Sequence, residues 1–445
     1  MPEIASSPAS TLTPAKTARQ RSDTLTSIWM IIAVAMAIVT LVVKNRMPQP
    51  LWTMIHLVTL GVLSNGIFQW SWFFARSLAR LSADDPRARR HNTIRILIFN
   101  ACFLLLFVSM WLGWMVGTMI AATGIAAVAA WHGAEMLSVL RERLASRFVI
   151  VLRYYVCSAS FFVLAALLAS FVSATMFSPS IPEAMVAMRD RLTLAHALSG
   201  VAGWVGLTIG GTVITLGPTI LRTRMSPDAV SGGVRVLLPW CLSLLLAIAG
   251  ALLGVMPLVG AGILAVGTCA IVGIVYPYAK VLRNKGPREY SAWSFLLGLL
   301  WISVGVCALG VASLFVSTPS QLRALTLMWL PIIGIAGFAQ LFQGALSYLM
   351  PVVIGGGPSV VRIGIAIIDW QYSLRLGLRN SALILELFLF FTSDSPSVHV
   401  LRMAGWFLVI ATFVIDVVIY AKTGVTQARA RRARSETLSE SRQVQ

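Results

Sequence analysis

The stretch 154–176, YYVCSASFFVLAALLASFVSATM, contains no charged side chain. A helix of about 20 apolar residues spans the hydrocarbon core of a bilayer, so this stretch predicts a transmembrane helix. Eleven further apolar stretches of about 17–27 residues lie on either side of it: 27–43, 51–75, 96–114, 118–140, 192–216, 236–256, 258–279, 290–316, 324–350, 378–393 and 398–420. The sequence therefore predicts an all-α, polytopic membrane helix bundle of about twelve transmembrane helices.

Composition supports a membrane protein and excludes a soluble one. Hydrophobic residues make up 58% of the chain and charged residues 11%, whereas soluble domains carry roughly 25% charged residues. The net charge of +19 is compatible with nucleic-acid binding. The basic residues, however, lie in short clusters between the apolar stretches, as in cytoplasmic loops of membrane proteins. The expected partner is the lipid bilayer and not a nucleic acid.

The distribution of positive charge predicts the orientation. If the amino terminus lies inside, 29 of the 35 Lys and Arg residues fall on the inner side of a twelve-helix arrangement. Short cytoplasmic loops carry the excess of basic residues. We therefore expect a multi-pass protein of the cytoplasmic membrane, with both termini in the cytoplasm.

The apolar stretches divide the chain into three parts. We expect a disordered cytoplasmic tail at 1–26, a twelve-helix membrane domain at 27–420 and a basic cytoplasmic tail at 421–445. The first apolar stretch lacks a cleavage-site pattern, so no cleaved signal peptide is expected. The basic tail is suited to anionic lipid head groups; docking of a protein partner is the alternative.

A repeat of four helices would account for the spacing of three helices. The second, sixth and tenth predicted helices begin near residues 51, 192 and 324, and their inner halves are rich in small and polar residues. Small residues allow close helix packing in membranes. We interpret this spacing as three four-helix pseudo-repeats.

Histidines are the candidate metal ligands. His56 and His196 each lie within a few residues of the same, outer end of their helices, that is, within about 10 Å of the boundary. Imidazole binds copper and iron, including haem iron. Hydrogen-bonded histidines without metal are the alternative. His132 lies deeper, with Glu135 on the same helix face, so this pair could bind metal, relay a proton or form a simple pair.

Polar residues at membrane depth form two further candidate sets. The amides of Asn65, Gln69, Gln340 and Gln343 either line a polar cavity or hydrogen-bond between helices. The carboxyl groups of Glu386 and Asp416 lie within the last two predicted helices. Because a carboxyl group there is costly unless paired or protonated, they are candidates for a proton path.

Several segments resemble one membrane protein family. They are 55–61 (IHLVTLG) with 64–67 (SNGI), 195–197 (AHA), 215–225 (TLGPTILRTRM) and 343–353 (QGALSYLMPVV). They resemble haem-copper-oxidase-like membrane proteins of the NnrS type, and most closely the actinobacterial branch. The resemblance covers about 30–420 and implies twelve helices in three arcs, with metal ligands on the second, sixth, seventh and tenth.

The resemblance also implies a function, with departures. NnrS-type relatives are associated with haem, copper and nitric oxide stress, and actinobacterial relatives with copper oxidation or a cupredoxin domain. In this chain Leu198 replaces a second histidine of the family pattern, and the seventh and tenth helices contain no histidine. An oxygen-reducing binuclear centre of the family type therefore lacks its ligands.

Three functions remain open from the sequence. The first is a protein that binds haem or copper near the outer face and serves metal homeostasis, nitrosative stress or respiratory assembly, with a cupredoxin or respiratory partner. The second is a transporter or permease with an amide-lined cavity. The third is a structural or assembly subunit without metal. No motif decides whether the protein is an enzyme.

Overall fold

The described part of the chain is helical throughout. The computed structural model describes residues 14–82, 84–146, 148–177, 182–224, 227–284, 286–393 and 395–443, and no β-strand occurs within these ranges. The predicted all-α class is therefore confirmed.

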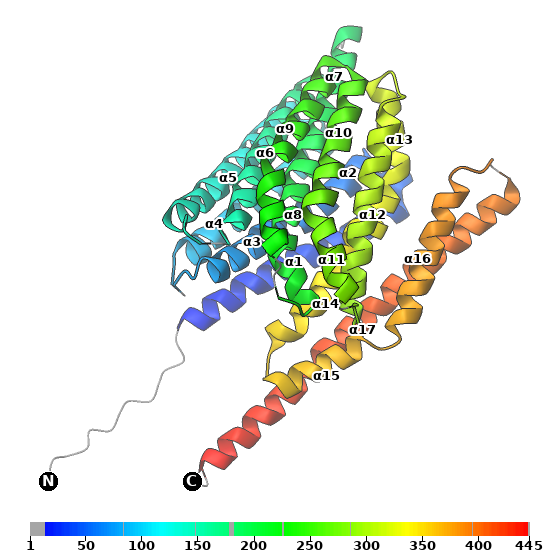
Figure 1. Cartoon of the computed structure of the whole chain (residues 1–445). Helices are drawn as coiled ribbons and strands as arrows, with labels where there is room; N and C mark the ends of the chain where they lie inside the picture. The colour runs from blue at the N-terminus through cyan, green and yellow to red at the C-terminus, as the bar shows by residue number, and fades with distance from the viewer. Residues whose placement is uncertain are drawn as a thin grey trace. The chain divides into compact units, whose positions relative to one another are not determined.

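Ten helices among the described residues are long and apolar enough to cross a membrane (Figure 1). They are Pro50–Leu78, Arg87–Leu112, Met115–Glu142, Val149–Met176, Ala184–Ile220, Pro227–Leu253, Met256–Arg283, Tyr290–Ser313, Pro319–Ile354 and Pro396–Thr437. The protein is an integral, multi-pass membrane protein.

Two of the twelve predicted spans are not among these ten, so the exact number is not confirmed. The stretch 27–43 belongs to α1 (Pro14–Val43), of which only Ile28–Thr40 counts as an apolar segment. The stretch 378–393 overlaps α16 (Tyr372–Leu389), an 18-residue helix. α16 contains two arginines and a glutamate, and these charges lower its mean hydropathy.

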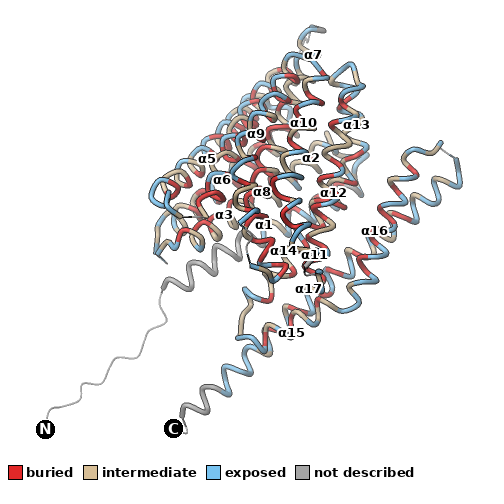
Figure 2. Tube along the Cα trace, in the orientation of Figure 1, coloured by how far each residue is buried: buried red, intermediate tan, exposed pale blue. Residues whose placement is uncertain are grey.

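Both predicted tails are partly helical. α1 begins at Pro14, inside the segment 1–26, and the part of that segment before Pro14 lies outside the described ranges. α17 (Pro396–Gln443) continues from the membrane through most of 421–445. Beyond residue 428 the described residues of α17 are largely exposed, as Figure 2 shows.

The chain forms two compact units. The first unit comprises 1–212 and 244–258, and the second comprises 213–243 and 259–445.

The first unit is built from consecutive helices that pack against their neighbours, α4 on α5 and α5 on α6. Gly113, in the left-handed region at φ 65°, ends α4 and allows a turn of two residues before α5. Glycine adopts this conformation at little cost. The helices are α2 (Pro50–His56), α3 (Asn65–Leu78), α4 (Asn92–Leu112), α5 (Met115–Glu142), α6 (Val149–Met176) and α7 (Glu183–Ala197).

The second unit centres on a group of helices near the carboxyl end. α16 and α17 run antiparallel side by side (Figure 1), and α12 packs on α14. Trp301, Ile332, Leu383 and Val409 belong to their shared core. The helices are α12 (Tyr290–Ser313), α13 (Pro319–Pro331), α14 (Gln340–Ile354), α15 (Pro358–Ile368), α16 and α17.

A π-helical segment interrupts each of the three helices that the sequence predicts to be equivalent. These segments are η2 (Leu57–Ser64), η4 (Leu198–Gly206) and η6 (Ile332–Ala339). In the structure these helices begin at Pro50, Glu183 and Pro319, so the π-helical segments start 7, 15 and 13 residues after the beginning of the helix. A further π-helical segment, η5 (Ile271–Val275), interrupts the span Met256–Arg283.

Candidate functional site

Two histidines of the first unit lie side by side. His56 is the last residue of α2 and His196 lies in the last turn of α7, and a π-helical segment follows closely after each. Their ring centroids are 6.1 Å apart, and the ring planes differ by 16°. The structure thus brings together two of the three histidines that the sequence offers as metal ligands, at a type of helix irregularity that is frequent at functional sites.

Each of the two rings is held by a backbone carbonyl. Nδ1 of His56 lies 2.8 Å from the Trp52 oxygen, and Nδ1 of His196 lies 2.8 Å from the Ala165 oxygen. Because a carbonyl oxygen only accepts, Nδ1 must carry the proton and Nε2 the lone pair. No described residue forms a hydrogen bond with Nε2 of either ring. Metal-binding histidines show this arrangement, with the second nitrogen donating to a carbonyl.

Trp52 supports His56 from within the same helix. Its ring stacks on the imidazole with a centroid distance of 4.3 Å and an interplanar angle of 22°. Residues four apart lie on the same face of a helix. Pro50 is the first residue of α2, after Gln49 in the left-handed region, so this contact forms in the first turns of the helix.

The donor set fits a site with two protein ligands. The two rings offer two imidazole nitrogens within one small region of the first unit. Among the described residues there is no group of three His, Cys, Asp or Glu side chains placed to hold a metal ion. Two imidazoles are fewer ligands than a binuclear oxidase centre needs, and imidazole is a donor that copper and iron accept.

His132 is buried apart from any metal-ligand group. Its ring is fully buried on α5 and meets the rings of Phe68 and Trp204 edge to face at 5.0 Å and 6.0 Å. Nε2 lies 3.4 Å from Ser71 Oγ, and Nδ1 has no partner among the described residues.

Glu135 is engaged by groups other than His132. Its carboxylate accepts hydrogen bonds from His91 Nδ1 at 2.7 Å and Trp131 Nε1 at 3.0 Å, and it pairs with the buried Arg95. The structure therefore does not bring the two candidates on α5 together in one pair.

Three of the four predicted amides form hydrogen bonds between helices. Asn65 and Asn100 exchange two amide hydrogen bonds of 3.0 and 2.8 Å in the first unit. Gln340 and Asn380 exchange two of 3.1 and 3.0 Å in the second. Gln343 accepts a hydrogen bond from the guanidinium of Arg379. Gln69 lies half-buried on α3.

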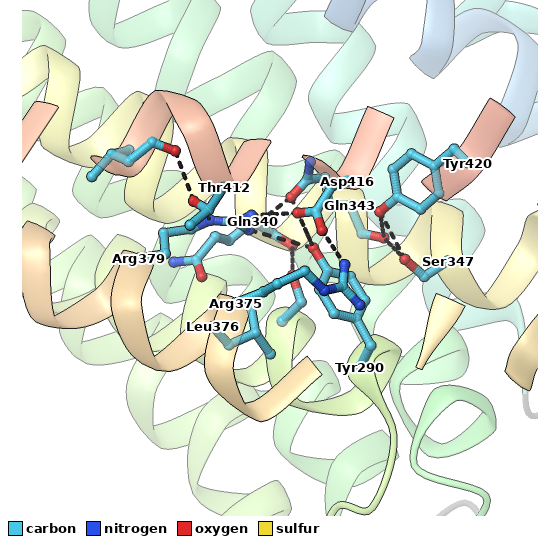
Figure 3. Close-up of polar contacts among 12 residues, drawn as sticks. Tyr290, Gln340, Gln343, Ser347, Arg375, Leu376, Arg379, Thr412, Asp416 and Tyr420 are labelled. Carbon is cyan, nitrogen blue, oxygen red and sulfur yellow. Dashed lines mark hydrogen bonds and ion pairs between the residues drawn. The ribbon is translucent and has the colours of Figure 1, made fainter. Parts of the chain in front are cut away.

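Asp416 is the centre of a polar cluster in the second unit (Figure 3). Its two carboxylate oxygens pair with the guanidinium groups of Arg375 and Arg379, and the Tyr290 hydroxyl donates to it at 2.6 Å. Arg379 also donates to Gln343 Oε1 at 2.9 Å. Each of these donors has an acceptor, so the cluster holds α12, α14, α16 and α17 together.

Glu386, the second predicted carboxyl group, has a different environment. Its side chain is 5% exposed, and Oε1 has no hydrogen-bond partner among the described residues. Oε1 occupies the space that a Cβ atom at Gly405 of α17 would need. The two predicted carboxyl groups therefore lie in the same unit but differ in their partners: Asp416 is ion-paired with two arginines, and Glu386 Oε1 has no hydrogen-bond partner among the described residues.

Sequence reasoning missed the arginines of these clusters. Arg95, Arg375 and Arg379 are buried, although the charge count places them at the cytoplasmic side of the membrane. The four-residue spacing of Arg375 and Arg379, on one helix face, was an available signal. Their partners lie about 40 residues away in the sequence, and no local pattern marks them.

These observations define a polytopic α-helical membrane protein with a paired-histidine site in its first unit and a buried ion-pair cluster in its second. No family model and no curated protein sequence matches the chain. The NnrS-type resemblance therefore stays a prediction.

Proposed function

We propose that the protein binds copper or haem iron through His56 and His196. The observation that carries the proposal is the pair of neighbouring imidazoles, each held by a carbonyl at Nδ1 and each without a described partner at Nε2. A bound haem iron or copper would supply one-electron chemistry at this place. The chain's own contribution is to fix both rings before the metal arrives.

The predicted resemblance suggests where such a protein acts. NnrS-type relatives support a role in metal homeostasis, nitrosative stress or respiratory assembly, with a cupredoxin or respiratory protein as partner. A site with two protein ligands does not make a complete oxidase.

We further propose that the protein resides in the cytoplasmic membrane with both termini inside. Leaving out the three buried arginines, 26 Lys and Arg residues still fall on the inner side, against 6 on the outer. Fusion of alkaline phosphatase and of a fluorescent protein to the carboxyl terminus tests this orientation. Fluorescence without phosphatase activity is expected, and the reverse would overturn it.

The metal proposal is tested by purifying the full-length protein in mild detergent after metal-replete expression with haem precursor. The visible spectrum and the metal content by mass spectrometry are measured together. His56→Ala and His196→Ala are compared with His399→Ala, which alters a histidine of α17 in the second unit. Stoichiometric haem or copper is expected in the wild type and in His399→Ala, and in neither of the other two.

A colourless, metal-free wild-type protein would overturn the metal proposal. Substrate flux in proteoliposomes without metal would then favour a transporter, and a stable co-purifying partner without flux would favour an assembly subunit. The hydrogen bonds between Asn65 and Asn100 and between Gln340 and Asn380 engage these amides within the helix bundle, so they support the transporter less than the paired histidines support metal binding.

A further inference from the structure

Glu386 is a buried carboxyl group without an ion-pair partner. It lies on α16 and faces α17, where its Oε1 packs against the backbone at Gly405. No cation among the described residues lies within ion-pair distance of its carboxylate. Its polar neighbours are Arg402 and Trp406, both on α17.

The other elements that pack on α16 offer no compensating charge. η6 consists of apolar residues and glycine, and the titratable residues of α12 are Tyr290 and Cys307, neither of them a cation. Arg402 directs its Nη2 to the carbonyl oxygen of Leu389 at 2.7 Å. Arg402, the charged neighbour of Glu386, therefore donates one of its hydrogen bonds to a backbone carbonyl and not to the Glu386 carboxylate.

Glu386 also faces a membrane-spanning helix. Gly405, its neighbour, belongs to the candidate span Pro396–Thr437. A buried carboxylate without an ion-pair partner loses its hydration without full compensation, and a buried acid avoids this cost by binding a proton.

Asp416 provides the contrast within the same unit. Both of its oxygens are paired with guanidinium groups, and a phenol hydroxyl donates to it as well. Asp416 thus has the surroundings of a structural carboxylate, and Glu386 has those of a neutral acid.

We propose that Glu386 is a proton-binding site inside the membrane and the preferred site of modification by hydrophobic carbodiimides. In this reaction the acid proton passes to a carbodiimide nitrogen, and the carboxyl oxygen bonds to the central carbon. The resulting O-acylisourea rearranges to a stable N-acylurea, so all atoms are retained and nothing is oxidised. The reaction needs the protonated acid and a reagent that partitions into lipid. This proposal does not depend on metal binding.

The test uses the full-length protein in lipid nanodiscs. Dicyclohexylcarbodiimide is added near neutral pH, and the modified peptides are identified by mass spectrometry. A single adduct on Glu386, with Asp416 unmodified, is expected. An unmodified Glu386, or equal modification of Glu386 and Asp416, would overturn the proposal.

Infrared spectroscopy gives a second readout that needs no reagent. The carbonyl stretching band of a protonated carboxylic acid is expected in the wild type, absent in Glu386→Gln and retained in Asp416→Asn. Both variants replace a carboxyl group by an amide of nearly the same size. Circular dichroism checks the fold of each, above all of Asp416→Asn, which loses a buried ion pair. Persistence of the whole band in Glu386→Gln would assign it to another residue and sink the proposal.

Discussion

The two units contain the same arrangement of buried polar residues and differ in what surrounds it. In the first unit Asn65 pairs with Asn100, and Arg95, five residues before Asn100, pairs with Glu135. Asn65 directly follows the π-helical segment η2. The arrangement ties three successive spans together.

The second unit repeats this arrangement with different residues. Gln340 directly follows η6 and pairs with Asn380, and Arg375, five residues before Asn380, pairs with Asp416. The arginine and its acid are 40 residues apart in the first unit and 41 in the second. The recurrence supports the predicted repeat, because the order of the residues and the intervals from the arginine to the amide and to the acid recur, although the two amide partners are 35 residues apart in the first unit and 40 in the second.

The difference between the units indicates which buried polar groups are structural. In the second unit Arg379, four residues after Arg375, forms a second ion pair with Asp416. In the first unit the residue four positions after Arg95 is Phe99. In the first unit His56 and His196 keep one ring nitrogen without a described partner. Buried polar atoms that satisfy one another specify the fold, whereas the two half-buried imidazoles, whose Nε2 atoms have no described hydrogen-bond partner, are candidates for binding.

Removing the acid of the second unit is expected to have the largest effect. Asp416→Asn leaves two buried guanidinium groups without a counter-charge, and breaking a buried pair in this way costs about 3–5 kcal/mol in the free energy of unfolding. Chemical or thermal unfolding in detergent measures the loss. Asp228→Asn, which removes an exposed pair with Lys280, is the control and should cost at most about 1 kcal/mol. Equal losses in the two variants would contradict a structural role for the cluster.

A glycine-to-alanine change in each unit is expected to have the next largest effect. Gly405 lies eleven residues before Asp416, and Gly124 lies eleven residues before Glu135. A Cβ atom at Gly405 would collide with Glu386 Oε1, and a Cβ atom at Gly124 would lie 2.6 Å from Cys102 Sγ. Gly405→Ala should destabilise the protein by about 1 kcal/mol, at the low end of overpacking costs, because Glu386 Oε1 is the end of a flexible side chain that can shift.

A double-mutant cycle checks the origin of this loss. Glu386→Ala removes the colliding atoms, so Gly405→Ala should cost less in that background than in the wild type, with a coupling of about 0.5 kcal/mol or more. Additive losses would show that the collision with Glu386 is not the cause. Gly124→Ala with Cys102→Ala is the matched cycle in the first unit.

The two amide pairs allow a direct comparison of the units. Asn65→Ala and Gln340→Ala each remove one side of a doubly bonded amide pair. Hydrogen bonds between membrane helices contribute about 0.6 kcal/mol on average and up to about 1.7 kcal/mol, so each variant should lose about 1 kcal/mol. Unfolding measurements on both variants show whether the two amide pairs contribute equally to the free energy of unfolding. A loss in only one variant would show that the amide pairs of the two units differ in their contribution to stability.

The long apolar spans could be predicted from the sequence, and the polar clusters could not. Hydropathy is a local property, so 154–176 predicts a helix without knowledge of its neighbours. The common depth of His56 and His196 predicted that they could meet. The partners of Arg375 and Asn65, in contrast, depend on the rotation of helices that lie 35–41 residues away, and in the sequence Arg375 looks like a loop residue.

Asp85, outside the membrane spans of the first unit, is expected to give the smallest and only pH-dependent effect. Hydrogen bonds from Arg87, 2.8 Å from the carboxylate, hold the pKa of Asp85 below its usual value. A carboxyl group whose pKa is lowered by folding stabilises the protein above its unfolded pKa of about 3.9, and this stabilisation is lost as the pH falls through the lower, folded pKa. Asp85→Asn should therefore cost up to about 1 kcal/mol near neutral pH and nothing in strong acid. Unfolding midpoints of the wild type and the variant across this pH range measure the difference, with the largely exposed Asp84, as Asp84→Asn, for comparison. A difference that does not change with pH would mean that Asp85 contributes through packing and not through its charge.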